Sequence, residues 1–287
     1  MTAPPAVTET NPVTRFAPSP TGHLHMGHAF AALEAANFAT RNGGRFLLRI
    51  EDIDHTRCRP ENTEQILEDL AWLGLEWEEP VRIQSEHLDD FQAAADQLEE
   101  AGFLYPCFCT RKDVLREIEA AGGAPHGSEG ALYPGICRNL TRDERQSRIS
   151  AGTPFALRLD VEKALNSLGE DLTWMDSEAG PQRVDPNALG DAIIVRKDIG
   201  TSYHLAVVVD DGLQGITDVV RGMDLFDSTH LHVILQGLLG LPAPTYHHHR
   251  LLTDDSGERL AKRNQSITLK SLREGGVTVD ELTAGWH

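Results

Sequence analysis

The sequence has no long hydrophobic run. No apolar stretch in its 287 residues approaches the roughly 20 that a membrane-spanning helix needs, and no apolar segment near the amino terminus follows a basic one. These absences argue against a spanning helix and a secretory signal, so we expect a cytoplasmic protein with no membrane partner. With 40% hydrophobic and 24% charged residues, the composition is that of a globular protein, and the length favours about two domains.

Positive charge is scarce. The chain has 26 lysines and arginines against 44 acidic residues, for a formal net charge of −18. Such a chain repels phosphate at long range, which excludes indiscriminate nucleic-acid binding. Any RNA contact needs a local basic patch, and the best candidate is Arg142, Arg145 and Arg148 in a helix expected over residues 141–150. A solvated helix face is the alternative for these arginines.

Cysteine is rare as well, with four residues in all. Three of them, Cys107, Cys109 and Cys137, lie in one segment. A cytosolic chain has little use for a disulfide, and zinc is the natural alternative for clustered thiols. A tetrahedral zinc site needs four donors, so one place is open, for which Tyr133 and His126 are both candidates on the residues alone. The alternative to a zinc site is that the cysteines are buried and chemically inert.

The most informative stretch lies near the start of the chain. Residues 13–17 can pair as a short strand, and two prolines and a glycine within residues 18–22 force a turn before an alanine-rich helical run. The N-terminus of that helix presents unpaired N–H groups and a positive dipole end, which together suit an anion. His25 and His28 lie at its mouth, and Gly27 allows a ligand to approach the backbone closely.

This stretch, Pro-Ser-Pro-Thr-Gly-His-Leu-His-Met-Gly-His over residues 18–28, resembles the first signature of the class I aminoacyl-tRNA synthetases in the form typical of glutamyl enzymes. The resemblance covers roughly residues 13–269. It implies an α/β fold with a Rossmann-type parallel-sheet catalytic domain that binds ATP, accompanied by Mg²⁺. His25, Gly27 and His28 would then contact ATP, and the two histidines would act in catalysis.

Several elements along the chain fit a parallel nucleotide-binding sheet. A strand over 45–50 follows the first helix, and amphipathic helices are expected over 61–73, 88–98 and 228–239. The apolar run 203–211 reads as a strand buried on both faces, flanked by strands over 192–196 and 216–222. The remaining segments form an inserted unit, with helices over 110–121 and 141–150, a loop over 122–130, and strands over 155–160 and 172–175.

The resemblance also implies a glutamate pocket. Glutamate carries two carboxylates and one ammonium, so it needs two cationic partners and one anionic partner. Arg15 and Tyr203 are assigned to the side-chain carboxylate, Arg221 to the α-carboxylate and Glu51 to the amino group, with Ser19 completing the set. Val207 departs from the family, where asparagine is usual, and this predicts weaker amino-acid binding.

The cysteines match a more specific relative. In the shortened glutamyl-synthetase paralogues called glutamyl-Q tRNA(Asp) synthetases, the zinc pattern is Cys-x-Cys followed by Tyr-x-x-x-Cys. Cys107, Cys109, Tyr133 and Cys137 fit this pattern, which makes Tyr133 the fourth ligand. Four protein ligands leave no open position, so the expected role of the zinc is structural.

Residues 257–263 resemble the second class I signature, Lys-x-Ser-Lys, with two departures. Arg259 replaces the first lysine and Ala261 the serine, whereas Lys262 is kept where it would steady the leaving pyrophosphate. The run His247 to His249 is read as a structural or surface element, because consecutive side chains rarely converge on one metal ion.

Residues 264–287 are too few for the helical domain with which glutamyl synthetases read the anticodon. We therefore expect no anticodon-binding domain, and a monomer that transfers glutamate to the queuosine base of tRNA(Asp). The alternatives are a fragment of an ordinary glutamyl or glutaminyl synthetase, a catalytically silent zinc-containing binding module, and another nucleotidyl transferase. The expected divisions are a mobile tail (1–12), two halves of the catalytic domain (13–104 and 191–245), an inserted zinc-containing acceptor-binding unit (105–190), and a segment with the second signature (246–287).

Overall fold

A parallel strand–helix–strand unit opens the fold, as the sequence predicts. The computed structural model describes residues 11–120, 126–127, 130–169, 171–186, 189–253 and 267–286. In it, β1 (Val13–Phe16) and β2 (Arg45–Ile50) pair in parallel around α1 (Met26–Arg41), with Arg15 opposite Leu47. The third strand of this sheet, β3 (Glu78–Ile83), is also parallel to β2.

A second sheet continues from the first. It has the order β11–β12–β8–β9, with β11 (Asp218–Gly222), β12 (Thr245–His249) and β8 (Thr173–Asp176) parallel and β9 (Gly180–Arg183) antiparallel. Two hydrogen bonds between Val13 and Thr217 join the beginnings of β1 and β11. The carboxyl ends of β1, β2 and β11 therefore meet at one edge, where parallel sheets bind ligands.

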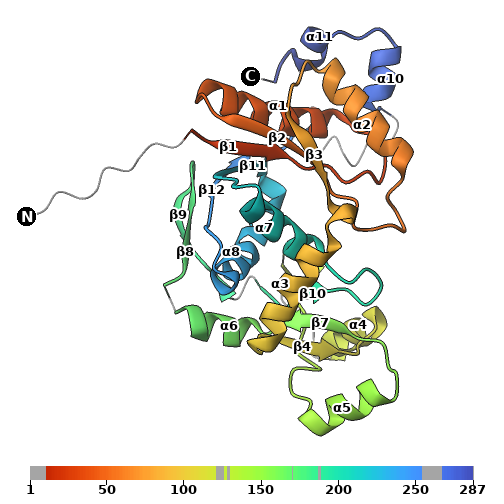
Figure 1. Cartoon of the computed structure of the whole chain (residues 1–287), viewed down its shortest axis with the longest axis vertical. Helices are drawn as coiled ribbons and strands as arrows, with labels where there is room; N and C mark the ends of the chain where they lie inside the picture. The colour runs from red at the N-terminus through yellow and green to blue at the C-terminus, as the bar shows by residue number, and fades with distance from the viewer. Residues whose placement is uncertain are drawn as a thin grey trace, which may run out of the picture.

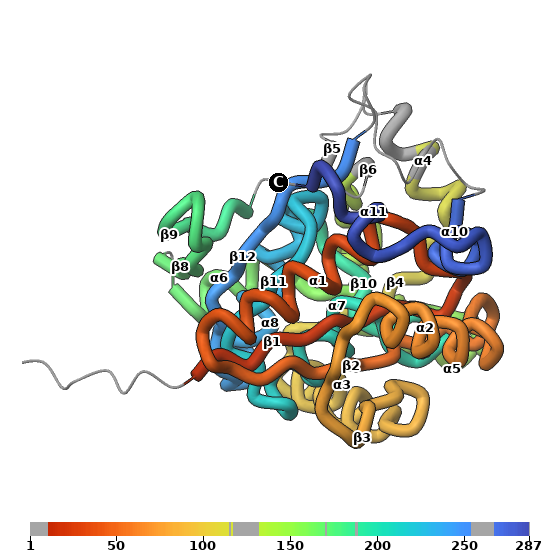
Figure 2. Tube along the Cα trace, turned by 90° about the horizontal axis from the view of Figure 1, so that it is seen from above, coloured from red at the N-terminus to blue at the C-terminus, as the bar shows by residue number. Residues whose placement is uncertain are grey.

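Helices cover both faces of these sheets. Figure 1 shows α3 (Leu88–Glu100), α7 (Tyr203–Leu213) and α8 (Ser228–Leu239) on one side and α1, α2 (Pro60–Trp72), α10 (Leu269–Glu274) and α11 (Val279–Thr283) on the other. Neighbouring strand residues divide between the two cores: Leu47 packs with α3, α7 and α8, whereas Phe46 and Leu48 pack with α1 and α2. In the view from above, α10 lies beside α2, which closes the second core (Figure 2).

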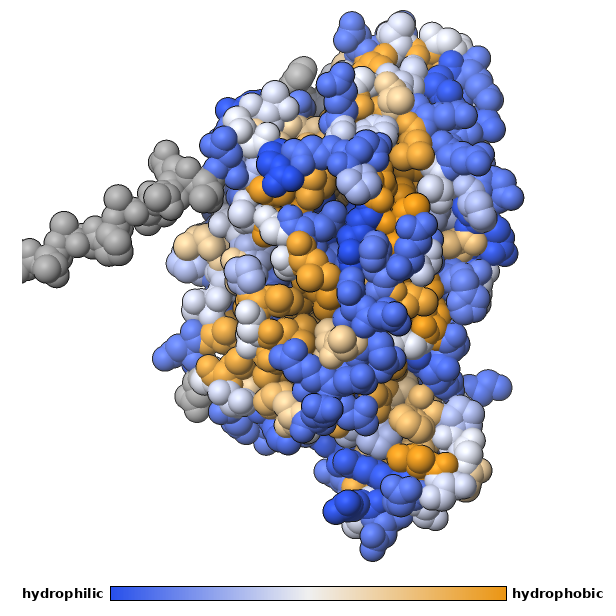
Figure 3. Space-filling view, in the orientation of Figure 1, coloured by the Kyte–Doolittle hydropathy of each residue, from blue (hydrophilic) through white to orange (hydrophobic). Residues whose placement is uncertain are grey.

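An inserted unit stands at the lower end of the molecule in Figure 1. Its sheet has the order β10–β7–β4 and consists of Ile193–Val195, Ala156–Leu159 and Leu104–Cys107, all antiparallel. Around it lie α4 (Arg111–Ala120), α5 (Arg142–Ser150), α6 (Val161–Leu168) and the short pair β5 (His126–Gly127) and β6 (Gly130–Ala131). Figure 3 shows mostly hydrophilic residues at this end, and α5 has no buried residue.

Residues 203–211, expected as a strand, form the helix α7 instead. The hydroxyl of Ser202 caps this helix by accepting a hydrogen bond from the backbone N–H of Leu205. Every residue from Leu205 to Asp211 is buried, so no polar face reveals a helical period. A continuous apolar run is compatible with a buried helix as well as a buried strand, and here the 11-residue length is that of a helix.

Two strands have other partners than expected. Residues 172–175 were assigned to the inserted unit, yet β8 pairs in parallel with β12 of the main sheet. Residues 192–196 were assigned to the parallel sheet, yet β10 pairs antiparallel with β7 of the inserted unit. The local pattern predicts a strand correctly in both places, but the choice of partner depends on packing between segments far apart in the chain.

The other predicted helices are confirmed, since residues 61–73, 88–98, 141–150 and 228–239 correspond to α2, α3, α5 and α8. Residues 1–10 of the expected tail and most of the expected loop 122–130 lie outside the described residues; within that loop, β5 pairs with β6. Among the described helices, none has the length and apolar character needed to cross a membrane.

Candidate active site

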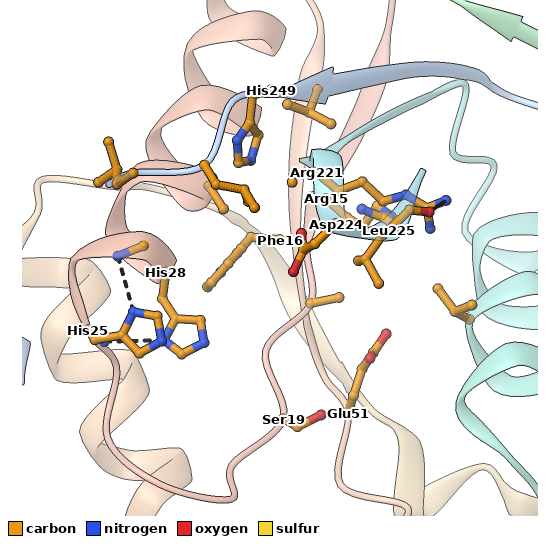
Figure 4. Close-up of a pocket in the computed structure, with 18 of the residues that line it drawn as sticks. Arg15, Phe16, Ser19, His25, His28, Glu51, Arg221, Asp224, Leu225 and His249 are labelled. Carbon is orange, nitrogen blue, oxygen red and sulfur yellow. Dashed lines mark hydrogen bonds between the residues drawn. The ribbon is translucent and has the colours of Figure 1, made fainter. Parts of the chain in front are cut away.

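A pocket of about 460 Å³ lies where β1, β2, β11 and the N-termini of α1 and α7 meet. Figure 4 shows the two histidines of the first signature at one side of this pocket, with Arg15 and Arg221 across from them. The pocket brings together eight of the residues singled out from the sequence, namely Arg15, Ser19, His25, Gly27, His28, Glu51, Tyr203 and Arg221. Lys262, Arg259 and Ala261 lie outside the described residues.

The two histidines are held in one tautomer by the backbone. Nδ1 of His25 accepts the N–H of Gly27 at 3.1 Å, and Nδ1 of His28 accepts the N–H of His25 at 3.2 Å. Because each neutral ring accepts at Nδ1, its proton lies on Nε2. The rings stack with centroids 3.7 Å apart, and burial together with His25 lowers the pKa of His28 to about 3. His28 is therefore an uncharged N–H donor at neutral pH.

Arg15 is anchored by Asp211 of α7. Its Nε and Nη2 donate to the two carboxylate oxygens at 3.0 and 3.3 Å, and both side chains are buried. Burial opposes ionisation of Asp211, but the charges of Arg15 and Arg49 outweigh it and lower the pKa of that carboxyl. The two terminal nitrogens of Arg15 keep N–H groups that no described residue uses, so its fork can still bind a carboxylate end-on.

Arg49 lies behind Glu51 and is fully buried. Its Nη2 is 2.8 Å from Asp211 and 3.5 Å from Glu51, and its Nε is 3.7 Å from Asp210. Burial still dominates at Glu51 and raises the pKa of that carboxyl to about 7, although Arg49 and Arg15 oppose this rise. Glu51 therefore titrates much closer to neutral pH than an ordinary glutamate does.

Arg221 has a different environment from Arg15. Its Nε donates to His248 at 3.1 Å, its Nη1 to His232 at 3.2 Å, and its Nη2 to Thr229 and to the carbonyl of Leu225. These contacts use four of the five N–H groups of a guanidinium. Within the described residues, one N–H on Nη1 is left for a ligand.

Tyr203 and Val207 lie one turn apart on α7 and both line the pocket. Val207 is buried, and burial raises the pKa of Tyr203, which keeps its hydroxyl neutral. Because side chains four positions apart share a face of a helix, the two residues present neighbouring points of the same wall. Residues four positions apart would also share a face in a strand, so Tyr203 and Val207 lie on one side in either structure.

The three clustered cysteines converge beside the sheet of the inserted unit. The sulfurs of Cys107, Cys109 and Cys137 lie within 4.8 Å of one another. The hydroxyl of Tyr133 is 3.3 Å from Sγ of Cys107 and 3.6 Å from Sγ of Cys109. Sulfurs bound to one zinc ion at about 2.3 Å lie about 3.8 Å apart, so this donor set has the spacing of a tetrahedral metal site.

The chain was compared with known proteins. Residues 12–283 match the family model described as tRNA synthetases class I (E and Q), catalytic domain. The glutamyl-Q tRNA(Asp) synthetase of Rhodobacter capsulatus is 47% identical over 272 residues, which cover 93% of this chain and 96% of that protein. The chain belongs to the glutamyl-Q tRNA(Asp) synthetase family. The Symbiobacterium thermophilum member is 44% identical over 92% of this chain and 82% of its own length.

The fold of this glutamyl-Q tRNA(Asp) synthetase family member is also that of a solved relative. A crystal structure of a glutamate tRNA ligase from Elizabethkingia meningosepticum, in complex with its amino acid, superposes with a TM-score of 0.75 at 30% identity. The match covers 89% of this chain and 53% of the ligase, so the chain spans about half of that solved protein.

Sequence reasoning missed several charged residues of this family member. Three of them interrupt apolar runs: Arg49, Asp210 and Asp211. A charged residue inside a buried run requires a partner of opposite charge nearby, which these residues supply to one another. His249 was read as a structural or surface residue, yet it lines the pocket, and His248 contacts Arg221.

The arginine patch on α5 partly has other contacts. Arg145 donates to the carbonyl of Arg138 and stacks over Tyr105, while Arg148 lies 5.4 Å above the ring of Phe108. Arg148 is exposed, whereas Arg145 is partly buried and its Nε is enclosed. The use of this patch for RNA stays a prediction.

Proposed function

We propose that this chain activates L-glutamate with ATP and transfers the glutamyl group to the queuosine base of tRNA(Asp), in the cytoplasm. One observation carries the proposal: a single pocket holds the first-signature histidines, two arginines of differing hydrogen-bonding capacity, and Glu51. Family membership supports the choice of substrates, because the members named above are glutamyl-Q tRNA(Asp) synthetases.

The arrangement supports a specific orientation of glutamate. Arg15 keeps an end-on fork that matches a planar carboxylate, so it suits the side-chain carboxylate together with the hydroxyl of Tyr203. Arg221 offers one N–H to the α-carboxylate, and its contacts among the described residues are all neutral. Glu51 and Ser19 lie near each other at the pocket wall and suit the ammonium group (Figure 4).

Activation is an acyl transfer through an adenylate. An oxygen of the α-carboxylate attacks the α-phosphorus of ATP, and the bond from that phosphorus to the bridging oxygen breaks, releasing pyrophosphate. The Nε2–H groups of His25 and His28 and the N-terminus of α1 stabilise the charge on the phosphates. Lys262 assists the leaving pyrophosphate, and Mg²⁺ bound to ATP supplies further neutralising charge.

In the second step a hydroxyl of the queuosine base attacks the activated carbonyl, and AMP leaves. No covalent bond to the protein is needed, so catalysis consists of positioning and charge stabilisation. The arginine patch of α5 is the candidate surface for the RNA backbone, since the chain as a whole is acidic.

Cys107, Cys109 and Cys137, with the hydroxyl of Tyr133, are the residues that would hold a structural zinc ion. Their spacing fits tetrahedral coordination, and burial raises the pKa of Cys109 to about 12, a penalty on the thiolate that a divalent cation would offset. The ion would tie the end of β4 to residues 133–137 and so stabilise the inserted unit.

The test is ATP–pyrophosphate exchange with glutamate, measured with and without tRNA, beside Lys262→Ala. We expect exchange that requires glutamate, is not supported by glutamine, and falls in the variant. Charging should then occur on tRNA(Asp) that contains queuosine and not on the same tRNA lacking it. Charging of tRNA(Glu) would identify an ordinary glutamyl synthetase, and absence of exchange under both conditions would identify a silent binding module.

A further inference from the structure

Arg221 is a buried cation that, in the part of the chain the structure describes, has only neutral hydrogen-bond partners. Three arginines are buried in the described part of the chain: Arg15, Arg49 and Arg221. The first two lie within 4 Å of carboxylates, whereas Arg221 contacts two imidazoles, a hydroxyl and a carbonyl. A buried positive charge in such a setting is held in place but not neutralised by direct contact.

Asp176 reaches Arg221 through one imidazole ring. Oδ2 of Asp176 lies 2.8 Å from Nδ1 of His248, and Nε2 of the same ring accepts the Nε–H of Arg221 at 3.1 Å. Because Nε2 accepts, the ring proton must lie on Nδ1 and point at Asp176. The other oxygen of Asp176 accepts the backbone N–H groups of Glu178 and Ala179 at 3.0 and 2.8 Å.

The three hydrogen-bonded residues come from three strands: Asp176 ends β8, His248 lies in β12 and Arg221 lies in β11. Aromatic rings enclose the imidazole: Tyr246 stacks on it, Phe226 lies 5.0 Å away and Trp174 lies 5.9 Å away. Asp176 and His248 are each only 1% exposed. The ring can therefore neither turn freely nor exchange its partners for water.

A similar contact fixes the other side of the guanidinium. Nδ1 of His232 accepts from Nη1 of Arg221, so its Nε2–H faces Nδ1 of His204 at 3.2 Å. Burial lowers the pKa of His232 well below its ordinary value, and burial with the charge of Arg221 lowers the pKa of His248 to about 4. Both rings are thus neutral acceptors at the pH of the cell.

We infer that Asp176 and His248 are positioning residues, which orient Arg221 through a fixed imidazole tautomer while leaving its charge available to the carboxylate of the substrate. This inference rests on the proposed function, in which Arg221 binds the α-carboxylate of glutamate. A carboxylate placed directly against Arg221 would compete with the substrate, as Asp211 does on one edge of Arg15. The intervening ring transmits the orientation without that competition.

The test substitution is Asp176→Asn, which is nearly isosteric. The amide oxygen keeps the two backbone N–H groups, so the NH₂ group faces Nδ1 of His248 and forces that nitrogen to accept. The ring proton then moves to Nε2 and opposes the Nε–H of Arg221. We expect the KM for glutamate to rise roughly tenfold or more, with a KM for ATP that changes little.

A control lies on two of these three strands, β11 and β12. Asp218 of β11 contacts Nε2 of His247 of β12 at 2.8 Å, one position away along β12 from His248 and on the opposite face. Asp218→Asn disrupts a second Asp–His contact of the same length, with side chains 16% and 17% exposed, without touching Arg221. We expect its KM for glutamate to match that of the wild type.

A spectroscopic readout tests the tautomer independently of activity. Nitrogen-15 NMR of the imidazole rings should show His248 protonated at Nδ1 in the wild type and at Nε2 in Asp176→Asn. Wild-type protonation at Nε2, or an unchanged KM for glutamate in a folded Asp176→Asn variant, would overturn the inference. If Asp176→Asn does not fold, His248→Gln replaces it: the amide can accept from Arg221 and donate to Asp176, so its KM should rise less than that of His248→Leu, and equal values would contradict the inference.

The inference and the proposed function fail in different ways. If wild type and Asp218→Asn both lack exchange with glutamate, with or without tRNA, the proposed function is wrong. The tautomer of His248 in wild type and in Asp176→Asn then still decides whether Asp176 orients the ring against Arg221.

Discussion

Arg15 of β1 and Asp211 of α7 are 196 positions apart in the chain and form a buried two-point ion pair at the floor of the pocket. The same carboxylate also binds Arg49, so one side chain of α7 sets the positions of two cations that come from neighbouring strands. This contact joins α7, which the sequence predicts as a strand, to β1, which the sequence predicts correctly. The same helix begins with the pocket residue Tyr203 and carries the buried pair Asp210 and Asp211 near its end.

Asp211→Asn should therefore reduce both stability and glutamate binding. Removing one charge from a buried pair leaves its partners uncompensated, which costs about 3 kcal/mol of unfolding free energy. Chemical denaturation and the KM for glutamate in pyrophosphate exchange measure the two effects. Asp198→Asn is the control, because its pair with Arg196 is about half exposed and should be worth less than about 1 kcal/mol. Equal effects of the two substitutions would contradict the assigned role of Asp211.

Glu51 should make glutamate binding depend on pH near neutrality. Burial raises its pKa to about 7, and the ammonium group of glutamate needs the ionised form. The KM for glutamate is therefore expected to rise as the pH falls below about 7. Pyrophosphate exchange measured between pH 6 and 8.5, at saturating ATP, gives this profile, and a flat profile would argue against contact between Glu51 and the ammonium.

The same shift has a consequence for stability, with the opposite direction. The folded-state pKa of Glu51 lies above its ordinary value of 4.5, so ionisation opposes folding. The protonated carboxyl of Glu51 therefore contributes its full stabilisation below about pH 4.5, and this stabilisation is lost as the pH rises through about 7. Glu51→Gln should thus stabilise the free protein at pH 8 by up to about 3 kcal/mol and do little at pH 5, while abolishing glutamate activation. Glu99→Gln, on the exposed face of α3, should leave thermal unfolding unchanged at both pH values.

Val207→Asn should strengthen glutamate binding. Val207 lines the pocket one turn after Tyr203, where an amide would supply a hydrogen bond that the valine lacks. We expect the KM for glutamate to fall about three- to tenfold. Val208→Asn is the comparison, since Val208 is equally buried but does not line the pocket, and it should only destabilise the fold. A KM that rises in Val207→Asn would show that the side chain here serves packing alone.

The cysteine cluster predicts about one zinc ion per chain. Cys137→Ser should lose the metal and lower the melting temperature, because the ion ties β4 to residues 133–137. Cys58→Ser should keep the metal, since Cys58 is not part of the cluster. Elemental analysis after extensive dialysis measures the content. A metal-free wild type whose unfolding does not respond to a chelator would favour inert cysteines.

Much of the catalytic architecture can be read locally. The turn after β1, the glycine stop after α1 and the alternation in residues 45–50 each depend on neighbours within a few positions, so they predicted the first parallel unit correctly. The Cys-x-Cys and Tyr-x-x-x-Cys spacings likewise predicted a cluster that does converge. Family resemblance added the pocket residues, and the fold brings all the described ones to a single cavity.

Other features depend on contacts that no local pattern contains. Residues 203–211 lack a polar face because α7 is covered on all sides, so a helix and a buried strand look alike in the sequence. The residue patterns of β8 and β10 are compatible with pairing in either sheet. Their partners are decided by packing between segments far apart in the chain. Asp211 finds Arg15, and His248 lies between Asp176 and Arg221, because parallel strands and the helices above them bring distant segments to one edge. The sequence thus shows which chemistry each residue type can perform. The charge partner of a residue and the tautomer of a histidine are decided only when the sheet is assembled.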